Sequence, residues 1–162
     1  MELLGVRLEL PANAPVVLLR EQQGERRVLP IYIGPEEARA IALALEGVTT
    51  PRPMTHDLLR DVLDATEARV VSVTVTELRE STFYAEIEIE SGGKMVRVSS
   101  RPSDAVALAV RVDAPIFASE NVLADAAMPA AEEGEEEQQE EIVDQFREFI
   151  DQVNPEDFAS DQ

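Results

Sequence analysis

Three short polar clusters carry the side chains of this sequence that are best suited to chemistry. They are Gly34-Pro35-Glu36-Glu37, Pro51-Arg52-Pro53-Met54-Thr55-His56-Asp57 and Arg101-Pro102-Ser103-Asp104. Each precedes apolar residues at helical spacing, so each marks the start of a predicted helix. The first turn of a helix presents unpaired N–H groups and a partial positive charge, and both attract phosphate. The clusters therefore predict an anion site, provided that the fold brings them together.

Two arginines and the single histidine are the side chains most suited to phosphate chemistry. Arg52 and Arg101 each precede a proline, which favours extended backbone just ahead of a helix. A guanidinium held there can bind a phosphate through two parallel hydrogen bonds. His56 can exchange a proton near neutral pH, so it is a candidate general acid or base. Structural alternatives stay open, because the arginines can tie loops to carboxylates and the histidine can be a hydrogen-bonded structural residue.

The carboxylates and hydroxyls of the same clusters have two alternative roles. Glu37, Asp57 and Asp104 are hard oxygen ligands that can hold Mg²⁺ or Mn²⁺ if the fold gathers them. In the first turn of a helix, however, an acid stabilises the macrodipole by about 0.3–1 kcal/mol without any ligand. Thr55 and Ser103 are predicted to be helix N-caps. None of these spacings is a specific catalytic signature.

The elements that must position the clusters are predicted from hydrophobic periodicity. Strand-like alternation dominates, mostly in hairpins, and a helical pattern follows each cluster. We expect strands near residues 6–10, 16–19, 28–33, 71–76, 83–90, 95–99 and 115–118, and helices from about residues 35, 55 and 102. This pattern predicts an α+β domain over residues 1–125, in which a mostly antiparallel sheet of hairpins packs against about three helices.

The last part of the chain has a different composition. Residues 126–139 combine small residues, one proline and a run of glutamates, which predicts a flexible acidic linker. Residues 140–162 are predicted to form an amphipathic helix followed by an acidic tail. Its apolar stripe consists of Ile142, Val143, Phe146, Phe149, Ile150 and Val153. We expect this stripe to pack on the main domain or on a second subunit.

Composition excludes several classes of protein. The chain of 162 residues has 33 acidic and 14 basic side chains and a formal charge of −19, with no cysteine and one histidine. The absence of cysteine excludes disulfides, thiolate zinc sites and a cysteine nucleophile. No secretory signal is visible at the N-terminus, and no apolar run approaches the roughly 20 residues that span a bilayer. We therefore expect a cytoplasmic protein without membrane contact.

Four runs of residues together resemble one known family. They are Leu29-Pro30-Ile31-Tyr32-Ile33-Gly34-Pro35-Glu36-Glu37, Pro51-Arg52-Pro53-Met54-Thr55-His56-Asp57-Leu58-Leu59, Thr82-Phe83-Tyr84-Ala85 and Arg101-Pro102-Ser103-Asp104-Ala105. In this order they are similar to bacterial members of the bifunctional nuclease (BFN) domain family, over roughly residues 1–125. The resemblance implies an α+β domain with nuclease activity on RNA and DNA.

The resemblance also implies a set of site residues at the three helix starts. We expect the catalytic residues to be His56, Asp57, Arg52 and Arg101, the substrate-binding residues to be Arg52, Thr55, Arg101 and Ser103, and the metal ligands to be Glu37, Asp57 and Asp104. Many members carry an aspartate two residues before the arginine of the last motif. This chain has Ser99 there, which removes one carboxylate from the expected site.

Two classes of function follow as hypotheses. The first is a metal-assisted phosphodiester hydrolase acting on RNA or DNA, with Mg²⁺ or Mn²⁺ as cofactor. The second is a non-catalytic module that regulates a partner protein or senses a small anion. Charge counts against nucleic-acid binding, because residues 1–131 carry a net charge of −7 and the remaining residues −12. We further expect a homo-oligomer, and an acidic tail that competes with nucleic acid.

Overall fold

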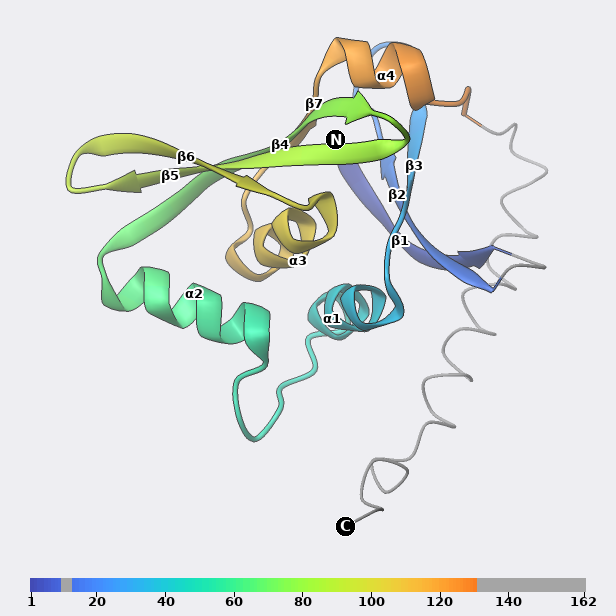
Figure 1. The fold of residues 1–162 in the computed structure, drawn as a ribbon. Helices are drawn as coiled ribbons and strands as arrows, with labels where there is room; N and C mark the ends of the chain where they lie inside the picture. Colours follow the sequence, from blue (N-terminus) through green and yellow to red (C-terminus); the bar gives the residue numbers. More distant parts are fainter. Residues whose placement is uncertain (10–12, 131–162) are drawn as a thin grey trace.

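The structure, a computed structural model, describes residues 1–9 and 13–130. Figure 1 shows the order and arrangement of their helices and strands. The strands are β1 (Glu2–Glu9), β2 (Ala14–Arg20), β3 (Val28–Tyr32), β4 (Ala68–Arg79), β5 (Thr82–Ser91), β6 (Lys94–Ser100) and β7 (Ile116–Ala118). The helices are α1 (Pro35–Leu45), α2 (Thr55–Ala65), α3 (Pro102–Val112) and α4 (Glu120–Ala126).

The strands form two sheets, which confirms the predicted α+β class. One sheet has the order β1-β2-β3 and the other β6-β5-β4-β7, and the pairs are antiparallel except β4 with β7. The parallel pair arises because β7 follows α3, and a helical crossover returns the chain in the direction of β4. The sequence predicted a sheet of hairpins, but it did not predict that the strands divide into two sheets. It also did not predict α4, a short helix that follows Ser119.

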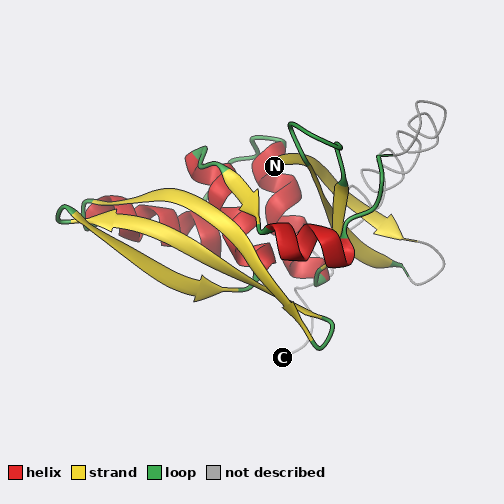
Figure 2. Cartoon of the chain, turned by 90° about the horizontal axis from the view of Figure 1, so that it is seen from above, coloured by secondary structure: helices red, strands yellow, loops and turns green. Residues whose placement is uncertain are grey.

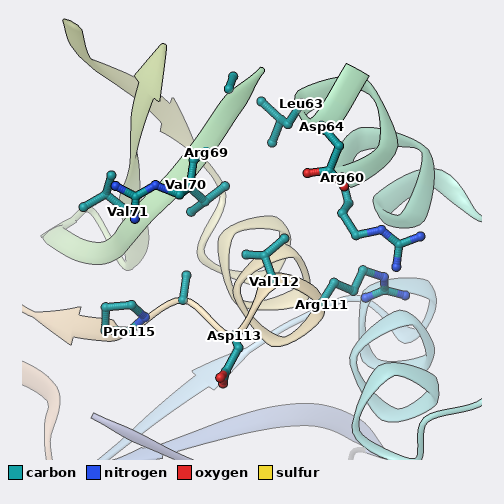
Figure 3. A pocket seen from close by; sticks show the side chains of 12 residues that line it. Arg60, Leu63, Asp64, Arg69, Val70, Val71, Arg111, Val112, Asp113 and Pro115 are labelled. Atoms are coloured by element: carbon teal, nitrogen blue, oxygen red, sulfur yellow. The ribbon is translucent and has the colours of Figure 1, made fainter. Parts of the chain in front are cut away.

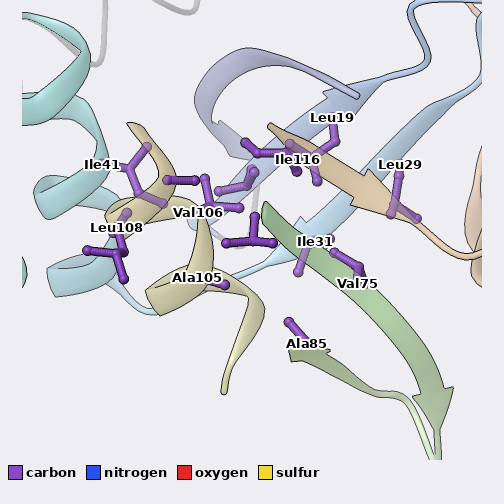
Figure 4. Packing of buried hydrophobic residues seen from close by; sticks show 14 of the residues in the cluster. Leu19, Leu29, Ile31, Ile41, Val75, Ala85, Ala105, Val106, Leu108 and Ile116 are labelled. Atoms are coloured by element: carbon purple, nitrogen blue, oxygen red, sulfur yellow. The ribbon is translucent and has the colours of Figure 1, made fainter. Parts of the chain in front are cut away.

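The hydrophobic core lies between the two sheets and is centred on α3 (Figure 4). Leu19 and Leu29 from the three-stranded sheet, Ile41 from α1 and Leu108 from α3 are fully buried. Helix α3 also buries a series of small residues, Ala105, Ala107 and Ala109. Small side chains let neighbouring elements approach closely, and α3 contacts α1, α2, β4 and β5. The start of α3 is therefore held in place by packing on several sides.

Helix α2 is attached to this core differently. It has no buried residue, and among its apolar side chains Leu63 packs against the core cluster. Helices α2 and α3 lie on the same side of the four-stranded sheet in Figure 1, and Figure 2 shows strands of that sheet crossing over α2. The polar side chains of His56 and Asp57 also attach α2 to α3, as described for the candidate site below.

The first residues of the predicted linker are held against the domain. Helix α4 ends at Ala126, and Met128 exchanges two backbone hydrogen bonds of 2.8 Å with Val28 of β3. The rest of the predicted linker, the predicted C-terminal amphipathic helix and the acidic tail lie outside the described residues. Within the described residues, no helix combines the length and the hydropathy needed to cross a membrane.

Candidate active site

The starts of α1, α2 and α3 meet at one chain of polar contacts. Arg101, which precedes α3, bridges Glu37 of α1 through Nη1 at 2.9 Å and Asp104 of α3 through Nε at 2.6 Å. A second bond joins Arg101 Nη2 to Asp104 Oδ1 at 3.1 Å. His56 of α2 completes the chain, with its Nε2 3.0 Å from the same Oδ1. Four of the sequence-predicted site residues therefore lie together, although they are up to 67 positions apart in the sequence.

The local sequence explains why the side chains at the starts of α1 and α3 can contact one another. Arg101 is the N-cap of α3 and Pro102 its first residue, so the extended backbone of Arg101 lets its side chain fold back onto Asp104. Gly34 has the same position ahead of α1. A Cβ at position 34 would collide with the Glu37 carboxylate, so glycine there leaves the space that the carboxylate occupies.

The predicted N-caps are wrong by one or two residues. The N-cap of α2 is Met54 rather than Thr55, and the N-cap of α3 is Arg101 rather than Ser103. The reason at α2 is that Asp57 reaches back and accepts a hydrogen bond of 3.0 Å from the N–H of Met54. A carboxylate in the first turn thereby replaces the hydroxyl that the sequence pattern favoured.

Electrostatics at the polar chain favour the ionised carboxylate. Burial opposes ionisation of Asp104, but hydrogen bonds from Arg101 and His56 outweigh it and hold the pKa of Asp104 below its usual range. The hydrogen bond with Asp104 raises the pKa of Arg101. The Arg101 side chain is 65% exposed, so part of its guanidinium faces solvent. At this end of the three helices, one exposed guanidinium thus contacts two half-buried carboxylates.

His56 is held in one orientation by Asp104. Its side chain is 11% exposed, and Nε2 makes the contact with the carboxylate. An ionised carboxylate can only accept a hydrogen bond, so the ring nitrogen that contacts it must carry a proton. In the neutral imidazole this proton is on Nε2, and Nδ1 is then a hydrogen-bond acceptor. Among the described residues, no hydrogen-bond partner contacts Nδ1. Nδ1 is therefore chemically able to accept a proton from another molecule.

Asp57 does not join this chain of contacts. Its Oδ1 accepts a 2.6 Å hydrogen bond from Nε of Arg111, whose side chain is only 5% exposed. Arg111 also donates to the carbonyls of Ala107 in α3 and Ala40 in α1. The hydrogen bond from Arg111 lowers the pKa of Asp57. The pair therefore joins α1, α2 and α3.

Sequence reasoning missed Arg111. The available signal was its position two turns after Asp104 on α3, next to the site on the same helix. A basic residue in the last turn of a helix is ordinarily explained by the macrodipole, so this signal was weak.

The remaining predicted residues lie apart from the polar chain or are covered. Arg52 is exposed in the loop between α1 and α2, and within the described residues its side chain makes no hydrogen bond or ion pair. Thr55 is exposed in the first turn of α2, whereas Ser103 is 6% exposed. Their substrate-binding roles stay predictions.

The predicted metal ligands are not assembled as a ligand set. Glu37 and Asp104 are both bonded to Arg101, and Asp57 is bonded to Arg111. Over residues 1–9 and 13–130, no group of three His, Cys, Asp or Glu side chains is placed to hold a metal ion. The donors as arranged do not fit a divalent cation, because at least one oxygen of each carboxylate is bonded to an arginine.

A cavity of about 400 Å³ lies beside the Asp57–Arg111 pair (Figure 3). It is bounded by the second half of α2, the first residues of β4 and the end of α3. Its lining combines aliphatic side chains with charged ones, among them Arg60 of α2, Arg69 of β4 and Arg111 of α3. Arg60 lies one helical turn after His56, so the cavity lies near the polar chain along α2.

The chain is similar in sequence to known proteins over most of its length. The family model of the bifunctional nuclease domain matches residues 17–131. Two uncharacterized proteins of Mycobacterium tuberculosis are each 46% identical to the chain over 164 residues, covering 99% of it and 98% of the relative. Bifunctional nuclease 2 of Arabidopsis thaliana is 30% identical over 112 residues, which are 66% of this chain and 34% of the plant protein.

Proposed function

The chain belongs to the bifunctional nuclease domain family, and from this premise we propose that it hydrolyses phosphodiester bonds at the Glu37–Arg101–Asp104–His56 chain of contacts. The observation that carries the proposal is the 3.0 Å contact of His56 with Asp104 beside the exposed Arg101. A base, its orienting carboxylate and a cation for the phosphate thus meet at three helix starts. RNA and DNA are the proposed substrates.

The geometry supports a different role for each of these side chains. Arg101 and the N–H groups at the starts of the helices attract a phosphate group, and the exposed part of the guanidinium binds it. His56 Nδ1 removes a proton from a water molecule as its oxygen bonds to phosphorus and one P–O ester bond breaks. The negative charge of Asp104 stabilises the imidazolium that forms, which then returns the proton to the leaving sugar oxygen. Glu37 is a positioning residue, because it holds Arg101 from the opposite side.

Metal dependence stays a separate prediction. When bound, Mg²⁺ or Mn²⁺ supplies Lewis-acid stabilisation of the phosphate charge. Because each of Glu37, Asp57 and Asp104 is bonded to an arginine, no step above depends on such an ion. Loss of cleavage on chelation, restored by added Mg²⁺ or Mn²⁺, would support this prediction and would require the carboxylates to leave their arginines, whereas the contacts described above predict that cleavage persists in the presence of a chelator.

The test is a cleavage assay on highly purified full-length protein with labelled single-stranded RNA and DNA. We expect His56→Ala to lose about 100-fold or more in rate, because a general base contributes at least that much. Arg101→Gln should weaken substrate binding. The matched control is Arg79→Gln, which removes an exposed guanidinium paired with Glu77 at the far end of β4.

Two outcomes of this assay decide the proposal. A selective loss in His56→Ala and Arg101→Gln, with Arg79→Gln at the wild-type rate and all melting temperatures close together, supports it. Cleavage by the His56→Ala variant at the wild-type rate would overturn the proposal, because the activity would then belong to another site or to a contaminating nuclease.

A non-catalytic anion-binding module is the second candidate. It is favoured by one observation: both carboxylates of the chain of contacts are already bonded to Arg101, as in a closed structural network. Such a module binds inorganic phosphate or a mononucleotide without turnover. At a hundredfold excess of ligand over its Kd, linkage predicts stabilisation by about 2.7 kcal/mol, which a thermal shift measures. Regulation of a partner protein belongs to the same hypothesis.

A further inference from the structure

The three-stranded sheet is apolar on the face that points away from the core. Its inner side chains, among them Leu19 and Leu29, belong to the core cluster. Successive side chains of a strand point to opposite faces, so the residues between them lie on the other side of the sheet. We call these side chains the outer apolar face: Val16, Leu18, Val28, Pro30 and Tyr32.

The outer apolar face is one continuous surface. In the strand register Val16 lies opposite Tyr32, Leu18 lies opposite Pro30, and Val28 follows on the same side of β3. Side chains that are paired in this way have Cβ atoms about 5 Å apart. Val16 is only 5% exposed although it lies outside the core cluster. Tyr32, in the edge strand, is 61% exposed.

The outer face of the four-stranded sheet is different. There Ser72 pairs with Glu88 and Thr74 pairs with Glu86, so the face is polar. Strand β2, in the middle of the three-stranded sheet, is instead apolar on both faces from residue 14 to residue 19. An antiparallel strand with one solvated face alternates apolar and polar residues, whereas strands covered on both faces are apolar throughout. The outer apolar face therefore has the composition of a covered surface.

The described helices pack on the other side of this sheet. Ile41 of α1, Leu108 of α3 and Val122 of α4 all belong to the core cluster, on the inner face. Figure 1 shows α2, α3 and the four-stranded sheet on one side of β1, β2 and β3. Contiguous apolar surface that is left without a layer marks an interaction site.

The chain leaves the described structure at the edge of this same sheet. Met128 exchanges two backbone hydrogen bonds of 2.8 Å with Val28 of β3, so the residues after 130 begin beside the outer apolar face. Residues 131–141 can span at most about 40 Å. Three strands about 4.8 Å apart make a sheet only about 10 Å wide between its outer strands. The segment that follows residue 141 can therefore reach every part of this face.

That segment has a complementary apolar stripe, although it lies outside the described residues. Its members recur at intervals of three and four and so share one face of a helix: Phe146, Phe149, Ile150 and Val153. A helix over residues 142–153 is about 18 Å long, and strands of five to eight residues are roughly 17–27 Å long. Residues 142–153 carry three acids and one base, and the cation Arg7 lies opposite Val16 on the sheet.

We propose that residues 142–153 form a helix whose apolar stripe packs across the outer apolar face of the same chain. The three-stranded sheet is then covered on both sides, by the core on one and by this helix on the other. The short tether keeps the segment at an effective concentration of the order of millimolar, which favours it over a second copy of the chain. The inference does not depend on the catalytic proposal.

Disulfide trapping in the full chain tests the position of the segment, because the chain has no native cysteine. Leu18→Cys combined with Phe149→Cys should form an intramolecular disulfide under mild oxidation. The matched control combines Phe149→Cys with Thr74→Cys, because Thr74 is also half-buried on an interior strand but lies on the polar outer face of the other sheet. We expect the first pair to close about tenfold faster or more, since docking raises its effective concentration. Tyr32→Cys with Phe149→Cys repeats the measurement at an exposed position, where the substitution leaves the packing of the domain intact.

Thiol labelling gives a second readout of the same contact. The Leu18→Cys thiol should react with a maleimide about tenfold faster when Phe146→Glu and Phe149→Glu are added, because the docked helix no longer shields it. The matched control adds Gln145→Glu and Gln152→Glu instead, which introduces the same two charges outside the apolar stripe.

Three results would overturn the proposal. The first is equal closure of the Leu18 and Thr74 cysteine pairs, and the second is equal labelling of the Leu18→Cys thiol in the two glutamate variants. The third is formation of disulfides only between chains, because the occupant of the outer apolar face would then be a second copy.

Discussion

At the scale of single residues, the site is defined by which acid contacts which base. Asp104 contacts Arg101 and His56, while Asp57 contacts Arg111, so the two aspartates have different tasks despite their similar positions in first helical turns. Asp104 orients the proposed general base. Asp57 holds helices together, and a loss of activity on its removal would not by itself identify a catalytic group.

The pH dependence of stability follows from these contacts. Hydrogen bonds from arginine hold the pKa of Asp57 and of Asp104 below the ordinary value of 3.8, so both carboxylates release their protons more readily in the folded state. Their contribution to stability is fully present above about pH 4 and is lost as the pH falls through the folded-state pKa values.

We therefore expect the melting temperature of the wild type to fall steeply below pH 4. The variant Asp104→Asn should be less stable at pH 7 and should lose less stability on acidification, because one titrating group is absent. Thermal unfolding from pH 2 to pH 7 measures both curves. Parallel curves would show that the ion pairs of Asp104 contribute nothing to folding.

At the scale of elements, the Asp57–Arg111 pair is the contact that joins α1, α2 and α3. Arg111 donates to Asp57 of α2 and to a backbone carbonyl of α1, and it is nearly completely buried. Because α2 has no buried residue, it depends on such polar contacts more than α1 or α3 does. Removing the carboxylate leaves a buried guanidinium with one partner fewer.

We predict that Asp57→Ala destabilises the protein by roughly 2–4 kcal/mol, somewhat less than removing one partner of a fully buried pair because Asp57 is partly exposed. The lost hydrogen bond to the Met54 N–H contributes to this change. The control is Asp61→Ala one turn further along α2, where the carboxylate is 45% exposed. We expect a change within about 0.5 kcal/mol there. Chemical denaturation of both variants measures the difference, and equal stabilities would contradict the proposed link between helices.

At the scale of the whole molecule, charge opposes the proposed substrate. The chain carries a formal charge of −19, of which residues 132–162 contribute −12. Binding of the proposed nucleic-acid substrate would therefore depend on exposed cations such as Arg101, which itself contacts two carboxylates. We expect the acidic C-terminal segment to lower that affinity further by repelling phosphate or by competing for these cations.

A chain that ends at residue 130 should accordingly bind single-stranded RNA more tightly than the full chain does. Its binding should also weaken more steeply with salt, because phosphate contacts release counterions. Fluorescence anisotropy over a salt series measures both effects. The matched control keeps the full length and replaces Glu132, Glu133, Glu135, Glu136 and Glu137 with glutamine. Superimposable binding curves for all three proteins would contradict this role of the charge.

The local sequence determined where the helices begin and which chemical groups stand there. Proline after Gly34 and Arg101, with acids in the first turn, predicted the starts of α1 and α3, and alternation predicted the hairpin of β4 and β5. These features depend on neighbours within a few residues, so they can be read directly from the chain.

Only the tertiary structure decided how these groups pair. Nothing in the spacing of Asp57 and Asp104 distinguishes the aspartate that contacts His56 from the one that contacts Arg111. The apolar pattern of α2 likewise predicted a helix, but not that Leu58 and Val62 would stay exposed. Pairing and burial depend on residues dozens of positions away, and the packing of α3 between the sheets and the other helices brings those residues together.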